Sequence, residues 1–240
     1  MWLETSIDVV GLPWCRGETR RIGIANLTAK FLCRHHNNSL SGADVAAVNA
    51  FAAIRRMTQL NNERAATAIK RRWKVRRFEV DGPCLERWFL KTAVNLALSG
   101  EDRRPTWHQW PSDGGAIPRA VAEMAFGRRA FVRPMGLYAT AGIGELIHST
   151  DAIEFAPLTS RASGGLTGFL FGFRGFRFLL WMVLDDLPEQ IEMPTMVGPL
   201  LRSHVLYHLR YLRSRVAKKQ SSYLDLLWPD QPASALVTLR

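Results

Sequence analysis

The chain has 240 residues, of which 47% are hydrophobic and 22% charged, so it carries enough apolar material for a substantial core in one large domain or two small ones. This composition excludes disorder throughout, and because no uninterrupted apolar stretch reaches about 18 residues, a membrane-spanning protein is not expected. Thirty-two Lys and Arg residues against 21 Asp and Glu residues give a formal net charge of +11, which bears on partners and solubility but not on the fold.

Patterns in the first 100 residues are mainly helical. Apolar residues at helical spacing predict helices, and alternation of apolar and polar residues predicts short strands. The predicted helices cover residues 41–58, 63–69 and 83–99, and the predicted strands cover 21–25 and 73–80. Asn61-Asn62 is expected to separate the first two helices because it interrupts their apolar stripe.

The second part of the chain changes character. A short predicted helix ends at Gly127. Aromatic and β-branched runs separated by Gly, Ser, Asp and Pro then predict antiparallel strands at 130–140, 145–156, 166–173 and 176–184. Arg174-Gly175 is expected to form the tight turn between the last two strands. The tail at 203–228 fits both a helix and an alternating strand, and we expect a helix there.

Together these elements predict an α+β fold with a helical N-terminal half and an antiparallel sheet in the C-terminal half. Residues 101–116 are charged, contain proline and glycine and show no period, so they are expected to form a loop or boundary. This divides the chain into a basic, mainly helical region at 1–100 and a region at 117–240 that holds the sheet and a C-terminal helix.

Cysteine usage indicates a reducing compartment. Cys15, Cys33 and Cys84 are odd in number and widely spaced, which is not the pattern of a disulfide framework. The first residues carry Glu4 and Asp8 and lack a basic segment followed by a long apolar core, so no signal peptide is predicted. A cytoplasmic location is therefore expected.

Cys33 and His36 have the C-x-x-H spacing of a metal-binding knuckle. A thiolate and an imidazole at this spacing can both face one zinc ion or another divalent metal from a tight turn, although a closed zinc site needs two further ligands. The alternative is structural: Cys33 packs as a small apolar side chain, while His36 and Asn38 cap or turn the chain before the following helix.

The sequence FLCRHHNNSLS at residues 31–41, followed by Asp44, resembles the second half of the treble-clef zinc knuckle in the HNH endonuclease superfamily. It is also similar to a group of uncharacterised bacterial proteins in which such a stretch opens a helix. The resemblance spans about residues 31–45 and implies a degenerate treble-clef knuckle. It also implies a phosphodiesterase site with His35, His36 and Asn37 as catalytic residues. The chain has no histidine before His35 and no upstream C-x-x-C. No residue in that part of the chain can act as the general base of the HNH family, so an intact endonuclease is not expected.

A dense basic segment lies between Arg55 and Arg77. It holds nine cations and one anion, Glu63, which gives a charge of +8 in 23 residues. A polyanion would relieve the repulsion within such a segment, and aromatic rings among the charges offer surfaces on which bases can stack. The residues expected to bind nucleic acid are Arg71, Arg72, Trp73, Lys74, Arg76 and Arg77. The alternative is a solvated surface paired to acidic residues elsewhere in the chain.

These observations leave three functional hypotheses. The first is a bacterial nucleic-acid-binding protein, for DNA or RNA, that is related to the HNH fold. The second is a metal-dependent HNH-like nuclease centred on His35, His36 and Asn37. The third is a basic subunit of a protein assembly that meets an acidic partner. No phosphate-binding or dinucleotide-binding glycine motif is present, and no membrane partner is expected.

Overall fold

The computed structural model describes twelve segments of the chain and supports the α+β class with an antiparallel sheet. The described segments are 6–9, 18–23, 34–66, 76–98, 117–141, 153–160, 165–173, 176–183, 205–208, 213–216, 222–229 and 236–239. The predicted boundary at 101–116 and the turn at 174–175 lie outside these segments, and the division of the chain into two regions stays a prediction.

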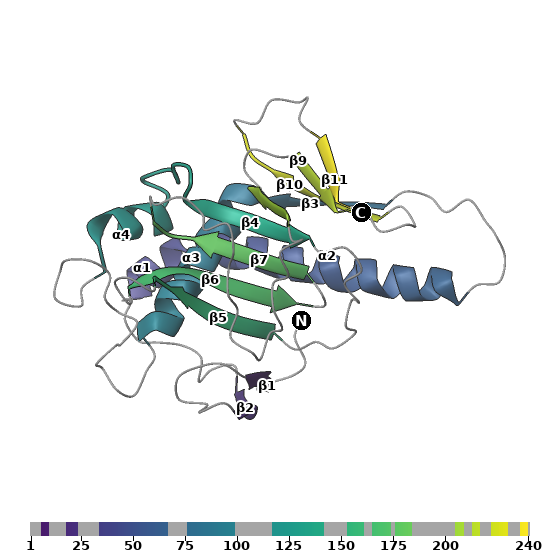
Figure 1. The fold of residues 1–240 in the computed structure, drawn as a ribbon, viewed down its shortest axis with the longest axis horizontal. Coiled ribbons are helices and arrows are strands. Elements are labelled where there is room, and N and C mark those ends of the chain that lie inside the picture. Colours follow the sequence, from purple (N-terminus) through teal and green to yellow (C-terminus); the bar gives the residue numbers. More distant parts are fainter. Residues whose placement is uncertain are drawn as a thin grey trace.

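The larger sheet has five antiparallel strands in the order β5-β6-β7-β4-β8 (Figure 1). Its strands are β5 (Ile153–Thr159), β6 (Leu166–Phe173), β7 (Phe176–Trp181), β4 (Gly136–Ala141) and β8 (Val205–His208). β6 and β7 pair antiparallel with Phe173 opposite Phe176, as the two neighbouring apolar runs predicted. The bounds of β6 agree with the prediction and β4 begins later than predicted, while residues 145–152 of the strand predicted at 145–156 lie outside the described segments.

The smaller sheet is mixed and has the order β11-β9-β10-β3. Its strands are β11 (Leu236–Leu239), β9 (Arg213–Val216), β10 (Ser222–Leu227) and β3 (Arg76–Asp81). β3 pairs in parallel with β10 and lies at the edge of the sheet. A separate antiparallel pair joins β1 (Ser6–Val9) to β2 (Arg20–Gly23) near the start of the chain.

Helix α3 (Gly82–Leu98) connects the two sheets, because it contacts β4 and β7 of the larger one and β3 and β10 of the smaller one. Helix α2 (Ser41–Ala65) packs along α3 and against β3 and β10. The short helices α1 (Arg34–Ser39) and α4 (Arg119–Ala125) lie at the same end of the molecule, where α2 begins (Figure 1).

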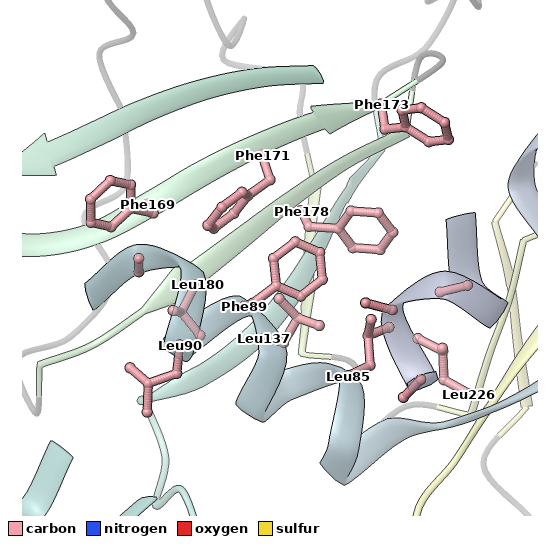
Figure 2. Packing of buried hydrophobic residues seen from close by; sticks show 14 of the residues in the cluster. Leu85, Phe89, Leu90, Leu137, Phe169, Phe171, Phe173, Phe178, Leu180 and Leu226 are labelled. Carbon is pink, nitrogen blue, oxygen red and sulfur yellow. The ribbon is translucent and has the colours of Figure 1, made fainter. Parts of the chain in front are cut away.

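The main core forms where α3 meets the larger sheet. Figure 2 shows Leu85, Phe89 and Leu90 of α3 beside phenylalanines of β6 and β7. The Phe89 ring centroid lies 4.7 Å from that of Phe171 and 5.2 Å from that of Phe178, which are the separations of favourable edge-on and tilted aromatic pairs. This packing fixes α3 against the larger sheet. Because α3 directly follows β3, it also fixes the end of β3.

The opposite face of the larger sheet carries a second apolar cluster. Its buried members are Tyr138, Ala156, Leu158, Leu170, Leu179 and Trp181. Phe169 and Leu170 are therefore both buried although they point to opposite faces of β6. Burial on both faces explains why the described residues 166–173 and 178–182 are almost continuously apolar instead of alternating. Within the described residues, no helix has the length and apolar character needed to cross a bilayer.

Two secondary-structure predictions are wrong. Helix α2 continues through Asn61-Asn62 to Ala65, because packing of residues such as Ile54 and Met57 outweighs the weak helix propensity of asparagine. The helix predicted for the tail at 203–228 is also wrong for the residues described there, which form β8, β9 and β10. Of the alternating residues Tyr207, Leu209 and Tyr211, only Tyr207 lies in a described strand, β8.

Gly168 is required for the close approach of β6 and β7. A Cβ atom at this position would lie 2.5 Å from the carbonyl oxygen of Leu180 on the neighbouring strand. We expect Gly168→Ala to lower the free energy of unfolding by about 1–3 kcal/mol, because the strands must separate to accept the methyl group. Gly42→Ala is the matched control: nothing lies within 4 Å of the added carbon in α2, so urea denaturation should show unchanged or slightly increased stability.

Candidate nucleic-acid interface

Three described cations of the basic segment lie on α2 and take part in interactions within the chain. Arg56 Nη1 lies 3.1 Å from Glu63 Oε1, forming an ion pair between half-exposed side chains. Arg64 is only 6% exposed, and both it and Arg55 make at least one interaction. Arg56 therefore follows the alternative of a cation paired within the chain, and since Arg55 and Arg64 also interact within the chain, the three add little to a surface for a polyanion.

Arg76 and Arg77 have a different environment at the beginning of β3. Both residues are exposed, and in the described part of the chain no ion pair joins either of them to a carboxylate. In register they lie opposite Ser222 and Tyr223 of β10, neither of which is acidic. The two arginines are therefore cations that the described neighbours leave uncompensated.

The burial of β3 explains where these arginines lie. Val80 is 3% exposed and Phe78 packs against the main core, so this face of the strand is directed toward the helices. Arg76 shares that face but lies beyond the core, whereas Arg77 is on the opposite face with Glu79 and Asp81. The start of the strand is thus cationic and its end is acidic. The other predicted nucleic-acid-binding residues, Arg71, Arg72, Trp73 and Lys74, lie outside the described residues.

The predicted catalytic residues His35, His36 and Asn37 lie on α1, and all three are exposed. They are part of a short helix rather than of an isolated tight turn. The ring centroids of His36 and Phe126 are 5.3 Å apart, so α1 touches the end of α4. The Ser39 hydroxyl donates a hydrogen bond to the His36 carbonyl oxygen at 2.7 Å and closes the last turn of α1.

The described residues near His36 do not supply a metal site. Of the two proposed ligands, His36 is described and Cys33 is not. Asp44, the nearest carboxylate downstream in the sequence, accepts hydrogen bonds from Lys91 Nζ at 2.9 and 2.8 Å with its two oxygens. Across the described segments, no three His, Cys, Asp or Glu side chains form a group that could hold a metal ion. Because Cys33 lies outside the described segments, the knuckle of Cys33 and His36 stays a prediction.

Cys84 lies in the first turn of α3. Asp81 Oδ1 accepts the Cys84 backbone N–H at 2.8 Å, and Arg87 Nη2 donates to the sulfur at 3.0 Å. Burial raises the pKa of the Cys84 thiol, and the opposing charge of Arg87 does not overcome this effect. Because the thiol stays protonated at neutral pH, Cys84 is suited to a structural role rather than to nucleophilic attack.

Sequence reasoning missed a second cationic region, at the end of α4. There the Arg128 N–H donates to the Glu123 carbonyl at 2.8 Å and the Gly127 N–H donates to the Met124 carbonyl at 3.0 Å, which is the pattern of a Schellman cap. Gly127 has the positive φ of 69° that this cap needs. The cap places Arg128 and Arg129 in an exposed turn. A glycine followed by two arginines after an apolar helix is the signal that could have revealed it.

Comparisons with protein-family models, with curated proteins and with solved structures found no significant match. The resemblance of residues 31–45 to the HNH knuckle therefore stays a prediction. The described side chains include two exposed groups of arginines, Arg76 and Arg77 at the start of β3 and Arg128 and Arg129 after α4.

Proposed function

We propose that the protein binds nucleic acid through a cationic surface that includes Arg76 and Arg77. The observation that carries this proposal is the exposure of both side chains at an edge strand, with no described carboxylate paired to either. Lys70, Arg71, Arg72 and Lys74 precede them in the sequence, so six cations fall within eight residues at 70–77. Phosphates along a backbone would neutralise closely spaced charges of this kind.

The chemistry of the cations favours phosphate contacts over recognition of particular bases. Arginine binds phosphate through a planar fork of donors and remains charged at any physiological pH. Contacts of this kind orient a nucleic acid but carry no direct sequence information. The proposed function is therefore binding with strong dependence on salt and weak dependence on sequence.

The test is a salt titration of binding to a labelled oligonucleotide, followed by fluorescence anisotropy. For the variant Arg76→Gln/Arg77→Gln we expect weaker binding to all sequences and a log-log salt slope reduced in magnitude by about 2, because two phosphate contacts are lost. The matched control is Arg20→Gln/Arg119→Gln, which removes the same charge from arginines that pair with Glu18 and Glu123. The control should keep the slope of the unaltered protein.

Two outcomes would contradict the proposal. If the slope is the same in both double variants, the start of β3 does not contact phosphate. If the purified protein carries an acidic protein at fixed ratio and binds no oligonucleotide, the cations serve an assembly instead. Cleavage of the oligonucleotide on addition of Mg²⁺, Mn²⁺ or Zn²⁺, abolished by His36→Ala, would replace simple binding by nuclease activity.

A further inference from the structure

Three aromatic rings, those of His35, His36 and Phe126, lie next to one another where α1 meets α4. The ring centroids of His35 and His36 are 5.7 Å apart, and those of His36 and Phe126 are 5.3 Å apart. Both imidazoles are exposed, whereas Phe126 is half-buried. The apolar core does not account for the two imidazoles, because every residue of α1 is exposed.

Arginines flank these rings on both elements. Arg34 precedes His35 at the start of α1, and the turn after Phe126 carries Arg128 and Arg129. All three are exposed, and no ion pair to a carboxylate is found for them among the residues that the structure describes. α1 itself contains no acidic residue. We name Arg34, His35, His36, Phe126, Arg128 and Arg129 the ring corner.

The turn that carries Arg128 and Arg129 is built into the fold. The backbone N–H groups of both arginines donate to the Glu123 carbonyl, at 2.8 and 3.2 Å. The guanidinium of Arg87, from α3, packs directly against Gly127, where a larger residue would meet it. Since α3 is anchored in the main core, the position of the turn relative to α1 is set by the core.

We propose that the ring corner binds unpaired nucleotides, with the bases stacked on the imidazoles and the phosphates on the arginines. This inference rests on the proposed nucleic-acid binding and adds the substrate class, single strands rather than duplex. The bases of a duplex are already stacked inside it, so exposed rings on a protein surface can stack only on bases that are unpaired. Every base has a ring face, so such contacts tolerate different sequences.

The test compares three labelled probes by fluorescence anisotropy in an alkaline buffer, in which an ordinary imidazole carries no charge. The first probe is an oligothymidylate of about 16 nucleotides, long enough to span one binding site. The other two are an abasic strand and a duplex of the same length. The abasic strand keeps the phosphates and removes the stacking partners. We expect the oligothymidylate to bind at least about tenfold more tightly than the abasic strand, the effect of stacking one base.

The decisive variant is His35→Ala/His36→Ala, which removes two exposed rings and leaves every arginine in place. It should bind the abasic strand as the unaltered protein does and lose the preference for oligothymidylate. Asn49→Ala on the exposed surface of α2 is the control and should keep that preference. Arg128→Gln/Arg129→Gln should weaken binding of both single strands to a similar degree, because it removes phosphate contacts only.

The outcomes separate this inference from the proposed function. If the unaltered protein binds none of the probes, nucleic-acid binding itself is wrong and the ring corner falls with it. If it binds all three equally and the histidine variant does the same, the ring corner is overturned while the contacts of Arg76 and Arg77 stand. The inference is supported if the histidine variant no longer binds the oligothymidylate more tightly than the abasic strand while its circular dichroism is unchanged.

Discussion

Replacement of Phe89 by alanine is expected to lower the free energy of unfolding by about 3–5 kcal/mol. The side chain is 1% exposed and its ring contacts Trp88, Phe171 and Phe178, so truncation removes an aromatic group from the centre of the main core and leaves a cavity. Urea denaturation followed by tryptophan fluorescence measures the change.

The control for this substitution is Val48→Ala, at a residue that is 49% exposed on α2. It should change the free energy of unfolding by no more than about 0.5 kcal/mol. A loss smaller than about 1 kcal/mol in Phe89→Ala would mean that the contact between α3 and the larger sheet does not hold the fold together. Both cationic surfaces depend on that contact, since α3 follows β3 directly and supports Gly127.

Glu86→Ala is expected to cost about 2–4 kcal/mol of stability. Glu86 is a carboxylate that is only 2% exposed, and its Oε1 accepts the backbone N–H of Leu137 at 2.9 Å. Leu137 is itself fully buried at the start of β4, so bulk solvent does not reach its N–H in the unaltered protein. The substitution leaves a buried N–H without a partner as well as a cavity.

Hydrogen exchange at the Leu137 amide reports on this bond directly. The exchange rate should rise strongly in Glu86→Ala and less in Glu86→Gln, because the amide oxygen of glutamine can still accept the hydrogen bond. Equal protection of Leu137 in all three proteins would show that the N–H finds another acceptor and that Glu86 does not anchor β4 to α3.

The fold could be predicted from the sequence where local pattern and tertiary environment agree. β6, β7 and α3 have strong apolar patterns bounded by glycine or proline, and the structure confirms them. Local signals failed where distant segments decide the structure. β8 pairs with β4 and β10 with β3, so the tail forms strands through partners far away in the sequence. The pattern within 203–228 fits both a helix and a strand, and the partner strands that decide between them lie outside this segment.

The same limit applies to the candidate site. Alternation placed Arg76 and Arg77 on a strand, and β3 confirms that placement. The ring corner joins His36 to Phe126, which lies 90 positions later, and no local pattern could bring these residues together. A local pattern of charge or spacing can therefore suggest which single helix or strand belongs to a binding surface. Which elements come together to form that surface depends on how the core packs.

The parallel pairing of β3 with β10 has a consequence for biosynthesis. Ser222 follows Asp81 by 141 positions, so the ribosome completes β3 long before its partner strand exists. Until then both edges of β3 are open to pairing with other nascent chains, as any unpaired strand is. Arg76 and Arg77 repel the same residues of another chain where two such strands meet in parallel during this interval.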